Sequence, residues 1–240
     1  MKKWLASALL GAVAVTGVAG DALASGGGAA HGQAAPGGPV DHSANWNYLW
    51  HHVLLDLYAI GIVFALITIW FMVSYRRRSA DQVGDMPHMD ISKILGWSLV
   101  PAFIFMADDF YLAANGWKLW TEQRTVPEGA LEVKGTAMMY NWDFEYENGA
   151  VSSLDLYVPR GVPVVVRSTS DDVVHSFFLA DYRIKEDVMP GRVTFVWFLP
   201  KEDSVLTCTE YCGTGHSDMY GMVKVLEPSK FDEWLAENAS

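Results

Sequence analysis

The sequence predicts two membrane-spanning helices followed by an all-β sandwich. Two uncharged apolar runs, residues 57–75 and 94–107, lie in the first half of the chain. After residue 131 the pattern changes to short β-branched and aromatic segments separated by turn signals, as in Greek-key sandwiches. Hydrophobic residues make up 51% of the 240 residues, and the mean hydropathy is +0.13. This composition agrees with a membrane anchor joined to a soluble domain.

The N-terminal residues have the pattern of an export signal. Lys2 and Lys3 precede an apolar run over residues 4–19, and the small residues Ala22 and Ala24 provide a cleavage site. A first membrane helix is the weaker alternative, because this run is short and rich in alanine and glycine. We therefore expect a signal peptide over residues 1–24 and a flexible, Gly/Ala/Pro-rich lead over residues 25–45.

The next segment, residues 46–120, is predicted to form a transmembrane hairpin with spans at about 53–75 and 94–117. At ~1.5 Å per residue, the uncharged run over residues 57–75 covers ~28 Å, enough for a bilayer core. Three arginines at 76–78 follow it and favour a cytoplasmic position for that end. We therefore expect a bacterial inner-membrane protein whose C-terminal domain lies on the periplasmic side.

The second span contains two adjacent carboxylates, Asp108 and Asp109. The run over residues 94–107 is too short to cross a bilayer unless this pair is included. A charge at the centre of a span costs about 3 kcal/mol on insertion scales. The pair is therefore either an intramembrane polar site, for protons, ions or another subunit, or it lies far enough out to reach headgroup water.

The C-terminal domain is expected to cover residues 121–240. Its short strands are evenly spaced, which favours a sandwich or Greek-key barrel. We also expect a closing helical turn at residues 231–237. The expected strands are 131–135, 142–146, 154–158, 162–168, 176–180, 193–199, 204–207 and 221–226.

Groups with metal-binding chemistry gather in one loop between the last two expected strands. Both cysteines of the chain, Cys208 and Cys212, are there, followed by His216 and Met219, and His175 lies upstream. Thiolate and thioether ligands combined with imidazoles select copper over magnesium, calcium or manganese. With one cysteine this set would describe a mononuclear blue-copper site, but two thiolates at i and i+4 can bridge two metal ions.

Two other interpretations of the loop are open. In an oxidising compartment two nearby cysteines commonly form a disulfide, and two cysteines with two histidines can hold zinc. Neither alternative has a use for Met219, so the set favours binuclear copper. No Cys-x-x-Cys-His motif is present, and we expect no haem on this chain.

The motif Cys-x-Glu-x-Cys-x-x-x-His-x-x-Met, with the upstream segment Asp172-Val-Val-His175-Ser, resembles the copper A (CuA) site of cytochrome c oxidase subunit II. The resemblance covers nearly all of the mature chain and implies a two-helix hairpin followed by a cupredoxin-like domain. It further implies that the Glu210 carboxylate binds magnesium at the boundary with subunit I. The segment 185–192 also matches a family segment near that boundary, although a Pro-Gly turn with solvated charges would look the same. The copper ligands that the resemblance implies are Cys208 and Cys212 as bridges, His175 and His216 as terminal ligands, and Met219 and the Glu210 carbonyl as weak ligands.

The resemblance also indicates where electrons arrive. Family members have an aromatic run whose first tryptophan accepts the incoming electron; here Tyr140 stands at that position and Trp142 at the position of the second tryptophan. Alternate strand residues also pack a core, so Trp142 has a structural interpretation as well. Residues 121–240 carry 10 Lys/Arg and 20 Asp/Glu, a net charge of −10 that would attract a basic donor such as cytochrome c.

The predicted function is that of the electron-accepting subunit of a respiratory haem-copper oxidase. The partners would be haem-bearing subunit I, other oxidase subunits, membrane lipid, and cytochrome c or a similar small redox donor. The net charge of −11 makes nucleic acid an unsuitable partner. We expect no catalytic acid, base or nucleophile on this chain, so it would serve as a non-catalytic subunit of a proton-translocating oxidoreductase.

An alternative function is that of the CuA subunit of a nitric oxide reductase in the same superfamily. Oxygen-reducing relatives often have a glutamate near the cytoplasmic start of the second helix. The corresponding positions here are Ser92 and Ile94, and the nearest acid is Asp90. This departure, with the Asp108–Asp109 pair, leaves the terminal acceptor open.

Overall fold

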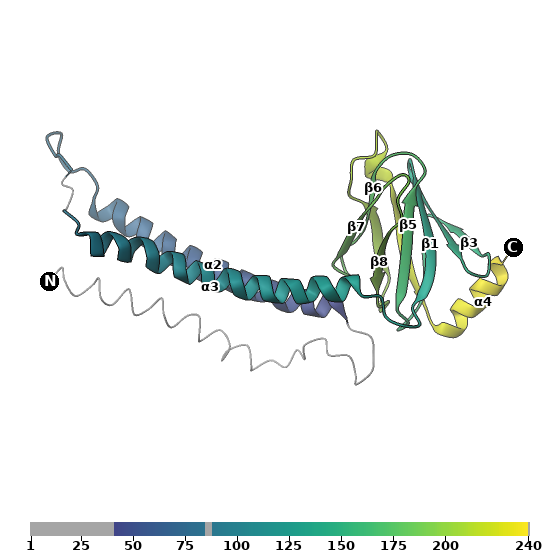
Figure 1. Cartoon of the computed structure of the whole chain (residues 1–240). Helices are drawn as coiled ribbons and strands as arrows, with labels where there is room; N and C mark the ends of the chain where they lie inside the picture. Colours follow the sequence, from purple (N-terminus) through teal and green to yellow (C-terminus); the bar gives the residue numbers. More distant parts are fainter. Residues whose placement is uncertain (1–40, 85–87, 240) are drawn as a thin grey trace. The chain divides into compact units, whose positions relative to one another are not determined.

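The computed structural model describes residues 41–84 and 88–239 (Figure 1). The expected signal peptide, the lead up to residue 40 and residues 85–87 of the connection between the helices lie outside these described residues. Two compact units are present, and each is described by itself. One contains residues 47–116, and the other contains residues 41–46 with residues 117–239.

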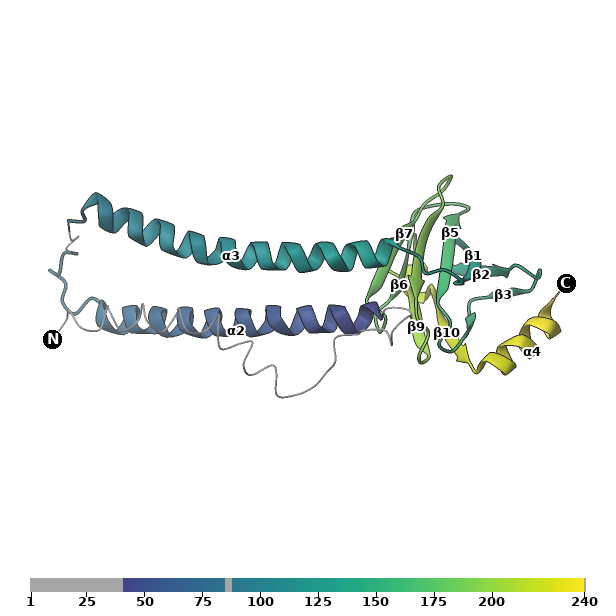
Figure 2. The ribbon, with the colours of Figure 1, turned by 60° about the horizontal axis from the view of Figure 1, so that its bottom comes forward.

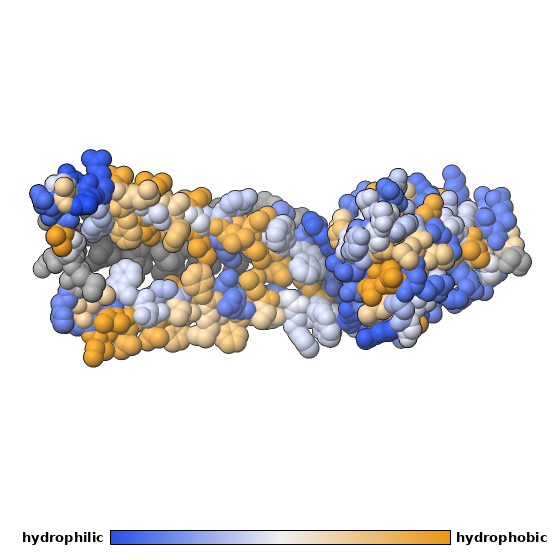
Figure 3. Space-filling model, turned by 90° about the horizontal axis from the view of Figure 1, so that it is seen from above, coloured by the Kyte–Doolittle hydropathy of each residue, from blue (hydrophilic) through white to orange (hydrophobic). Residues whose placement is uncertain are grey.

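The first unit consists of the greater part of two long helices, α2 (His42–Ser74) and α3 (Ile91–Arg124). Within residues 47–116 they lie side by side and run in opposite directions (Figures 1 and 2). Both are long and apolar enough to cross a membrane. Their outer faces are largely hydrophobic (Figure 3). The predicted fold class, a two-helix hairpin followed by a β-sandwich, is confirmed.

Both helices are longer than the spans expected from the sequence. At ~1.5 Å per residue, 33 and 34 residues give helices of about 50 Å, whereas a hydrocarbon core is about 30 Å thick. The helix start at residue 42 shows that the last residues of the expected flexible lead are helical. Asp41 precedes this start, and its carboxylate accepts the Ser43 backbone N–H at 3.1 Å, as an N-cap does. The end of α3 at Arg124 lies four residues beyond the expected hairpin boundary.

The β-domain is a sandwich of two five-stranded sheets with a short C-terminal helix (Figure 1). The first sheet has the order β3-β2-β1-β5-β8, and the second has the order β4-β10-β9-β6-β7. The pairs β1–β5 and β4–β10 are parallel, and the other strand pairs are antiparallel. The bounds are β1 Leu131–Met138, β2 Asn141–Tyr146, β3 Val151–Ser153, β4 Leu156–Pro159, β5 Val164–Ser170, β6 His175–Leu179, β7 Ile184–Val188, β8 Thr194–Phe198, β9 Ser204–Cys208, β10 Tyr220–Leu226 and α4 Pro228–Asn238.

Eight of these strands were expected from the sequence, but β3 and β7 were not. Strand β3 is only three residues long. Strand β7 has two buried apolar residues, Ile184 and Val188, around three polar ones. Most of it falls in the segment 185–192, which was matched to a family segment, with a Pro-Gly turn as the alternative, and not to a strand. The expected start of one strand at Leu154 was wrong, because Leu154 has a left-handed backbone (φ 69°) and the strand begins at Leu156.

The core between the sheets comes from the alternation of inward apolar and outward polar residues. In β2, for example, Trp142, Phe144 and Tyr146 are buried while their neighbours are more exposed. The helix α4 begins with a proline at its first turn, which suits the fixed φ of that residue. It adds Phe231 to the core and stacks Trp234 on Tyr157 with ring centroids 4.5 Å apart. This closed sandwich gives the loops at its end a fixed support.

Candidate metal centre

The motif loop begins where β9 ends, at Cys208, and returns to the sheet at β10. Two backbone hydrogen bonds hold its base: Cys208 N–H donates to the Met219 carbonyl at 3.1 Å, and Thr209 N–H donates to the Ser176 carbonyl at 3.2 Å. Strand β6 pairs with β9, so that His175 begins the neighbouring strand close to Cys208. Sheet pairing therefore brings an imidazole from 33 residues upstream to the cysteine loop.

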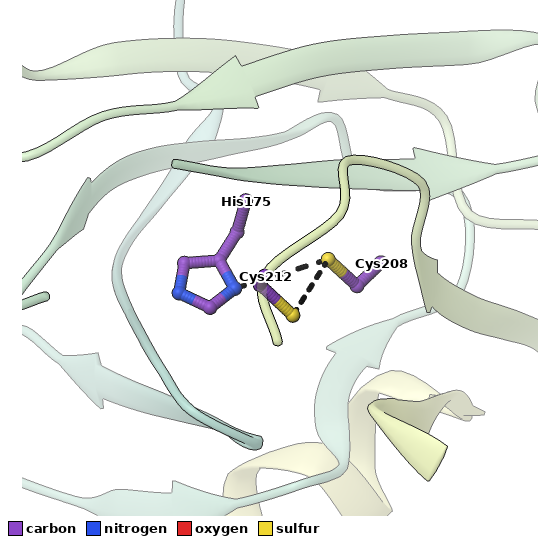
Figure 4. A group of neighbouring side chains, drawn as sticks. All are labelled: His175, Cys208 and Cys212. Atoms are coloured by element: carbon purple, nitrogen blue, oxygen red, sulfur yellow. Dashed lines mark hydrogen bonds between the residues drawn. The ribbon is translucent and has the colours of Figure 1, made fainter. Parts of the chain in front are cut away.

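The side chains expected to bind metal converge at this end of the sandwich. Figure 4 shows His175, Cys208 and Cys212 pointing toward one another. Their ligand atoms all lie within 4.8 Å of one another, and all three residues are buried. The two sulfur atoms are 3.8 Å apart and belong to free cysteines, and His175 Nδ1 is 3.8 Å from Cys208 Sγ.

The remaining members of the set complete the cluster around the two sulfurs. His216 Nδ1 is 3.4 Å from Cys212 Sγ, and Met219 Sδ is 3.7 Å from the same sulfur. The Glu210 backbone carbonyl accepts from Cys208 Sγ at 3.2 Å. The donor set thus contains two thiols, two imidazole nitrogens, one thioether and one carbonyl. The sulfur and imidazole donors fit copper. Met219 lies beside Cys212, where its thioether can act as a ligand, and neither a disulfide nor a Cys₂His₂ zinc site requires such a ligand.

The Cys212 thiol is in a setting that favours its neutral form when no cation is bound. Burial, followed by the proximity of the Cys208 sulfur, raises the pKa of the Cys212 thiol above its usual value. Two adjacent thiolates here need a positive charge between them, because otherwise they would repel each other in a buried environment. Metal binding at this cluster would therefore release thiol protons.

Asp172 anchors the first histidine of the cluster from the side opposite the sulfurs. Its Oδ1 atom is 2.8 Å from His175 Nε2. Partial burial alone would raise the pKa of Asp172, but hydrogen bonds from His175 and from the Met139 and Val173 backbone N–H groups lower it to about 2. The carboxylate is ionised at neutral pH and can only accept, so His175 Nε2 donates the proton. This arrangement leaves the Nδ1 lone pair of His175 facing Cys208.

Tyr140 covers the segment between Cys212 and His216. Two glycines make this close approach possible: a Cβ atom built on Gly215 would lie 2.6 Å from Tyr140 Cδ2, and one built on Gly213 would lie 2.6 Å from the Tyr140 hydroxyl. Gly213 also has φ 132°, a conformation that side chains rarely adopt. The tyrosine ring is half-buried and packs directly on the loop.

Trp142 lies deeper. Its ring is fully buried and is oriented edge-to-face against His175, with centroids 6.2 Å apart. A protein docking on the surface could touch Tyr140 but not Trp142. The two aromatic residues expected to receive electrons therefore differ in accessibility. Trp142 is buried beside the His175 imidazole, whereas Tyr140 is half-buried on the loop.

The other predicted site residues lie away from the cluster or contribute only their backbone. The Glu210 side chain is exposed, and only its carbonyl faces the sulfurs. Asp109 is exposed and Asp108 is half-buried on α3, 17 residues or about 26 Å from the start of that helix. Asp108 interacts electrostatically with Asp56 of α2, a neighbour that the sequence analysis did not single out. A 30 Å core beginning at Ile91 would contain Asp108 only near its far boundary.

The comparisons with known proteins agree with this geometry. Residues 145–226, which contain the whole cysteine loop, match the family model for the periplasmic domain of cytochrome c oxidase subunit II. This part of the chain, about a third of its length, is therefore similar to that domain.

Relatives match over most of this chain. Cytochrome c oxidase subunit 2 of Alkalihalophilus pseudofirmus is 28% identical over 210 residues, which cover 82% of this chain and 60% of the relative. The alternative cytochrome c oxidase subunit 2 of Bradyrhizobium diazoefficiens is 24% identical over 231 residues, covering 81% of this chain and 82% of the relative. Among solved structures, the periplasmic domain of subunit II from Bradyrhizobium japonicum is 26% identical, with a TM-score of 0.46, covering 48% of this chain and 96% of that domain. The chain thus spans 60% of the length of the Alkalihalophilus relative.

Proposed function

We propose that this chain accepts electrons from a soluble redox donor at a binuclear copper centre and passes them to haem in subunit I. The observation that carries the proposal is the convergence of two thiols and two imidazoles, with sulfur–sulfur and sulfur–nitrogen separations of 3.4–3.8 Å. The bridging ligands would be Cys208 and Cys212, and the terminal ligands His175 and His216. Met219 and the Glu210 carbonyl would be the weak ligands.

A copper pair held by these ligands would supply a one-electron redox couple. The contribution of this chain is to keep the ligands in place between the two oxidation states. The cluster is buried at the end of a sandwich, and backbone hydrogen bonds tie its loop to β6 and join the two ends of the loop, Cys208 and Met219. Ligands on such a rigid support move little when the charge changes, which favours electron transfer over bond-making chemistry.

The donor would approach the surface above the loop. Tyr140 is half-buried there, and Met139 and Tyr211 are exposed in the chain segments next to it. The excess of acidic residues over residues 121–240 would attract a basic donor such as cytochrome c and raise its association rate. Trp142 would connect this surface to His175 from within.

The orientation and the partners follow from the same proposal. The arginines at 76–78 would keep the helix connection in the cytoplasm, and the copper domain would face the periplasm. The Glu210 carboxylate, exposed on the loop, would bind magnesium with subunit I. Electrons would then serve oxygen reduction coupled to proton translocation in the complex.

The experiment that tests the proposal is electron paramagnetic resonance of the copper-loaded full-length chain in detergent. We expect hyperfine structure from one unpaired electron shared equally by two copper nuclei, together with about two copper ions per chain. A mononuclear spectrum, or binding of zinc in preference to copper, would refute the binuclear centre. Cys212→Ser is the matched variant, since it removes one bridge and leaves Cys208 and both histidines; a spectrum unchanged in this variant would contradict the bridging role.

The donor is tested separately in the assembled oxidase. Reduced cytochrome c should transfer electrons to the centre at a rate that falls as the ionic strength rises, because the acidic surface is screened. A rate independent of salt would mean that the charge of residues 121–240 does not attract the donor.

A further inference from the structure

Asp172 lies in the connection between β5 and β6 and accepts hydrogen bonds on both of its carboxylate oxygens. Oδ1 accepts from His175 Nε2 at 2.8 Å and from the Val173 backbone N–H at 2.6 Å. Oδ2 accepts the Met139 backbone N–H at 2.7 Å. The Asp172 side chain is 25% exposed and His175 is fully buried, so one carboxylate bridges a buried ring and a surface turn.

The second contact leads to the other side of the metal-binding cluster. Met139 immediately precedes Tyr140 in the turn between β1 and β2, and Tyr140 packs on Gly213 and Gly215. These glycines are part of the three-residue segment that connects Cys212 with His216. Asp172 is therefore joined to one imidazole directly, and to the loop that holds the other imidazole through Met139 and Tyr140.

We propose that Asp172 is a positioning residue for the whole cluster: Oδ1 fixes the ring orientation and tautomer of His175, and Oδ2 fixes the turn that carries Tyr140 against the cysteine loop. A carboxylate that accepts the second ring N–H of a metal-binding histidine orients that ring and raises its basicity. Here the same carboxylate has a second, independent task. The effect on copper affinity rests on the proposed function, whereas the effects on the ring and on the turn do not.

An alternative role for Asp172 is simply to contribute negative charge to a donor-docking surface. The neighbouring residue provides the control for this possibility. Asp171 is exposed, and its backbone N–H donates to the Ala137 carbonyl at 3.0 Å, so its position is held without its carboxylate. Asp171→Asn removes the same charge one residue away from the bridge. A docking role predicts similar effects of Asp171→Asn and Asp172→Asn on donor binding and none on the ring of His175.

The two oxygens of Asp172 can be separated by substitution. In Asp172→Asn only one oxygen remains, and it should stay at the Oδ1 position, because the opposite orientation would set the amide NH₂ against two donors, His175 Nε2 and Val173 N–H. The NH₂ group then faces the Met139 N–H, so only the link to the turn is lost. Asp172→Ala removes both links.

The test uses the metal-free full-length chain in detergent at neutral pH, uniformly labelled with ¹⁵N so that the histidine rings and the Met139 amide are both observed. In the wild-type chain we expect His175 to carry its proton on Nε2 and the Met139 amide to exchange slowly with solvent. In Asp172→Asn the tautomer should be kept while Met139 exchange accelerates at least tenfold. In Asp172→Ala both should change, and in Asp171→Asn neither should. A His175 tautomer unaltered in Asp172→Ala would overturn the first task, and unaltered Met139 exchange in Asp172→Asn would overturn the second.

Copper titration of the same variants adds a second measurement. Loss of a histidine-orienting carboxylate typically weakens metal affinity by 10- to 100-fold. We expect a loss in this range for Asp172→Ala, a smaller loss for Asp172→Asn, and wild-type affinity for Asp171→Asn. Equal losses in Asp171→Asn and Asp172→Ala would mean that negative charge, and not the bridge, is what matters. If the wild-type chain bound no copper, the proposed function would fail while the tautomer and exchange results would still decide the role of Asp172.

Discussion

The indole of Trp142 stands edge-to-face against the imidazole of His175, with ring centroids 6.2 Å apart and planes inclined by 63°. Trp142 also packs edge-to-face on Phe177, with centroids 5.6 Å apart. Its Nε1 atom has no hydrogen-bond partner within the described residues. The tryptophan thus supports a proposed metal ligand through packing alone, from a position that no docking protein can reach.

Replacement of Trp142 by phenylalanine should slow transfer of the electron without weakening binding of the donor. We expect the free energy of unfolding to fall by about 1–3 kcal/mol, because a smaller ring leaves a gap in the core. In the assembled oxidase, kcat with reduced donor should fall while KM stays unchanged, since the residue is fully buried. Steady-state kinetics checks this split.

Tyr140→Ala provides the contrast with Trp142→Phe. It removes the half-buried ring that packs on the cysteine loop, at the surface where the donor would bind, and should therefore raise KM. A raised KM in Trp142→Phe with normal kcat would contradict the assignment of Trp142 to the interior of the electron path. Retention of the two-copper spectrum in Trp142→Phe shows that the ligands are still in place.

Gly215→Ala should destabilise the domain for a steric reason alone. Its added Cβ would lie 2.6 Å from Tyr140 Cδ2 and 2.7 Å from Tyr140 Cε2. Such overpacking typically costs about 1–3 kcal/mol. In the Tyr140→Ala background the same glycine substitution should cost close to nothing, and the difference is measured by urea unfolding of the four chains in a double-mutant cycle.

A second glycine provides the control for this cycle. Gly116→Ala adds a methyl group on α3 where no atom lies within 4 Å. Its effect on the free energy of unfolding should be the same with Tyr140 and with Ala at position 140. Additive effects of Gly215→Ala and Tyr140→Ala would show that the ring does not press on the loop.

The four candidate ligands in the cysteine loop could be predicted from the sequence because they are closely spaced along the chain. Cys208, Cys212, His216 and Met219 fall within twelve residues of one loop, so a short motif contains most of the donor set. His175 was included in the expected donor set although it lies 33 residues upstream of Cys208, and its proximity to that cysteine depends on the pairing of β6 with β9.

What the sequence did not indicate depends on contacts between distant segments. The sequence offers two adjacent acids, Asp171 and Asp172, and nothing in their order shows that only the second reaches His175. Asp56 and Asp108 interact only because α2 and α3 run side by side. The edge strand β7 has a polar, charged outer face whose alternation is too short to distinguish from a turn.

Glu210→Ala should spare copper and disturb a different metal. The Glu210 carbonyl, at 3.2 Å from Cys208 Sγ, belongs to the backbone and survives the substitution, whereas the exposed carboxylate is lost. We expect an unchanged two-copper spectrum and a reduced magnesium content of the assembled oxidase. When magnesium is replaced with manganese, electron paramagnetic resonance measures the copper centre and the manganese at the magnesium site in one sample. Complete loss of copper would contradict this division between backbone and side chain.

The stability of the β-domain should decrease at alkaline pH through Tyr146. This tyrosine is buried, its hydroxyl donates to the Tyr157 carbonyl at 2.8 Å, and it accepts the Tyr157 backbone N–H at 3.0 Å. Burial raises the pKa of Tyr146 far above its usual value of 10.0. Because the folded chain holds this proton more tightly than the unfolded chain, the stabilisation is complete below pH ~10 and is lost as the pH rises beyond it.

Tyr146→Phe removes this dependence together with the two hydrogen bonds. At pH 8 the variant should be less stable than the wild type by about 1 kcal/mol, the usual net value of a buried hydrogen bond. Between pH 8 and pH 11 its urea midpoint should fall less than that of the wild type, since one proton fewer is released on unfolding. Tyr157→Phe is the control, because Tyr157 bonds to Tyr146 through its backbone and not through its hydroxyl. If Tyr157→Phe flattened the pH profile as much as Tyr146→Phe did, the alkaline loss of stability would not be specific to the buried hydroxyl of Tyr146.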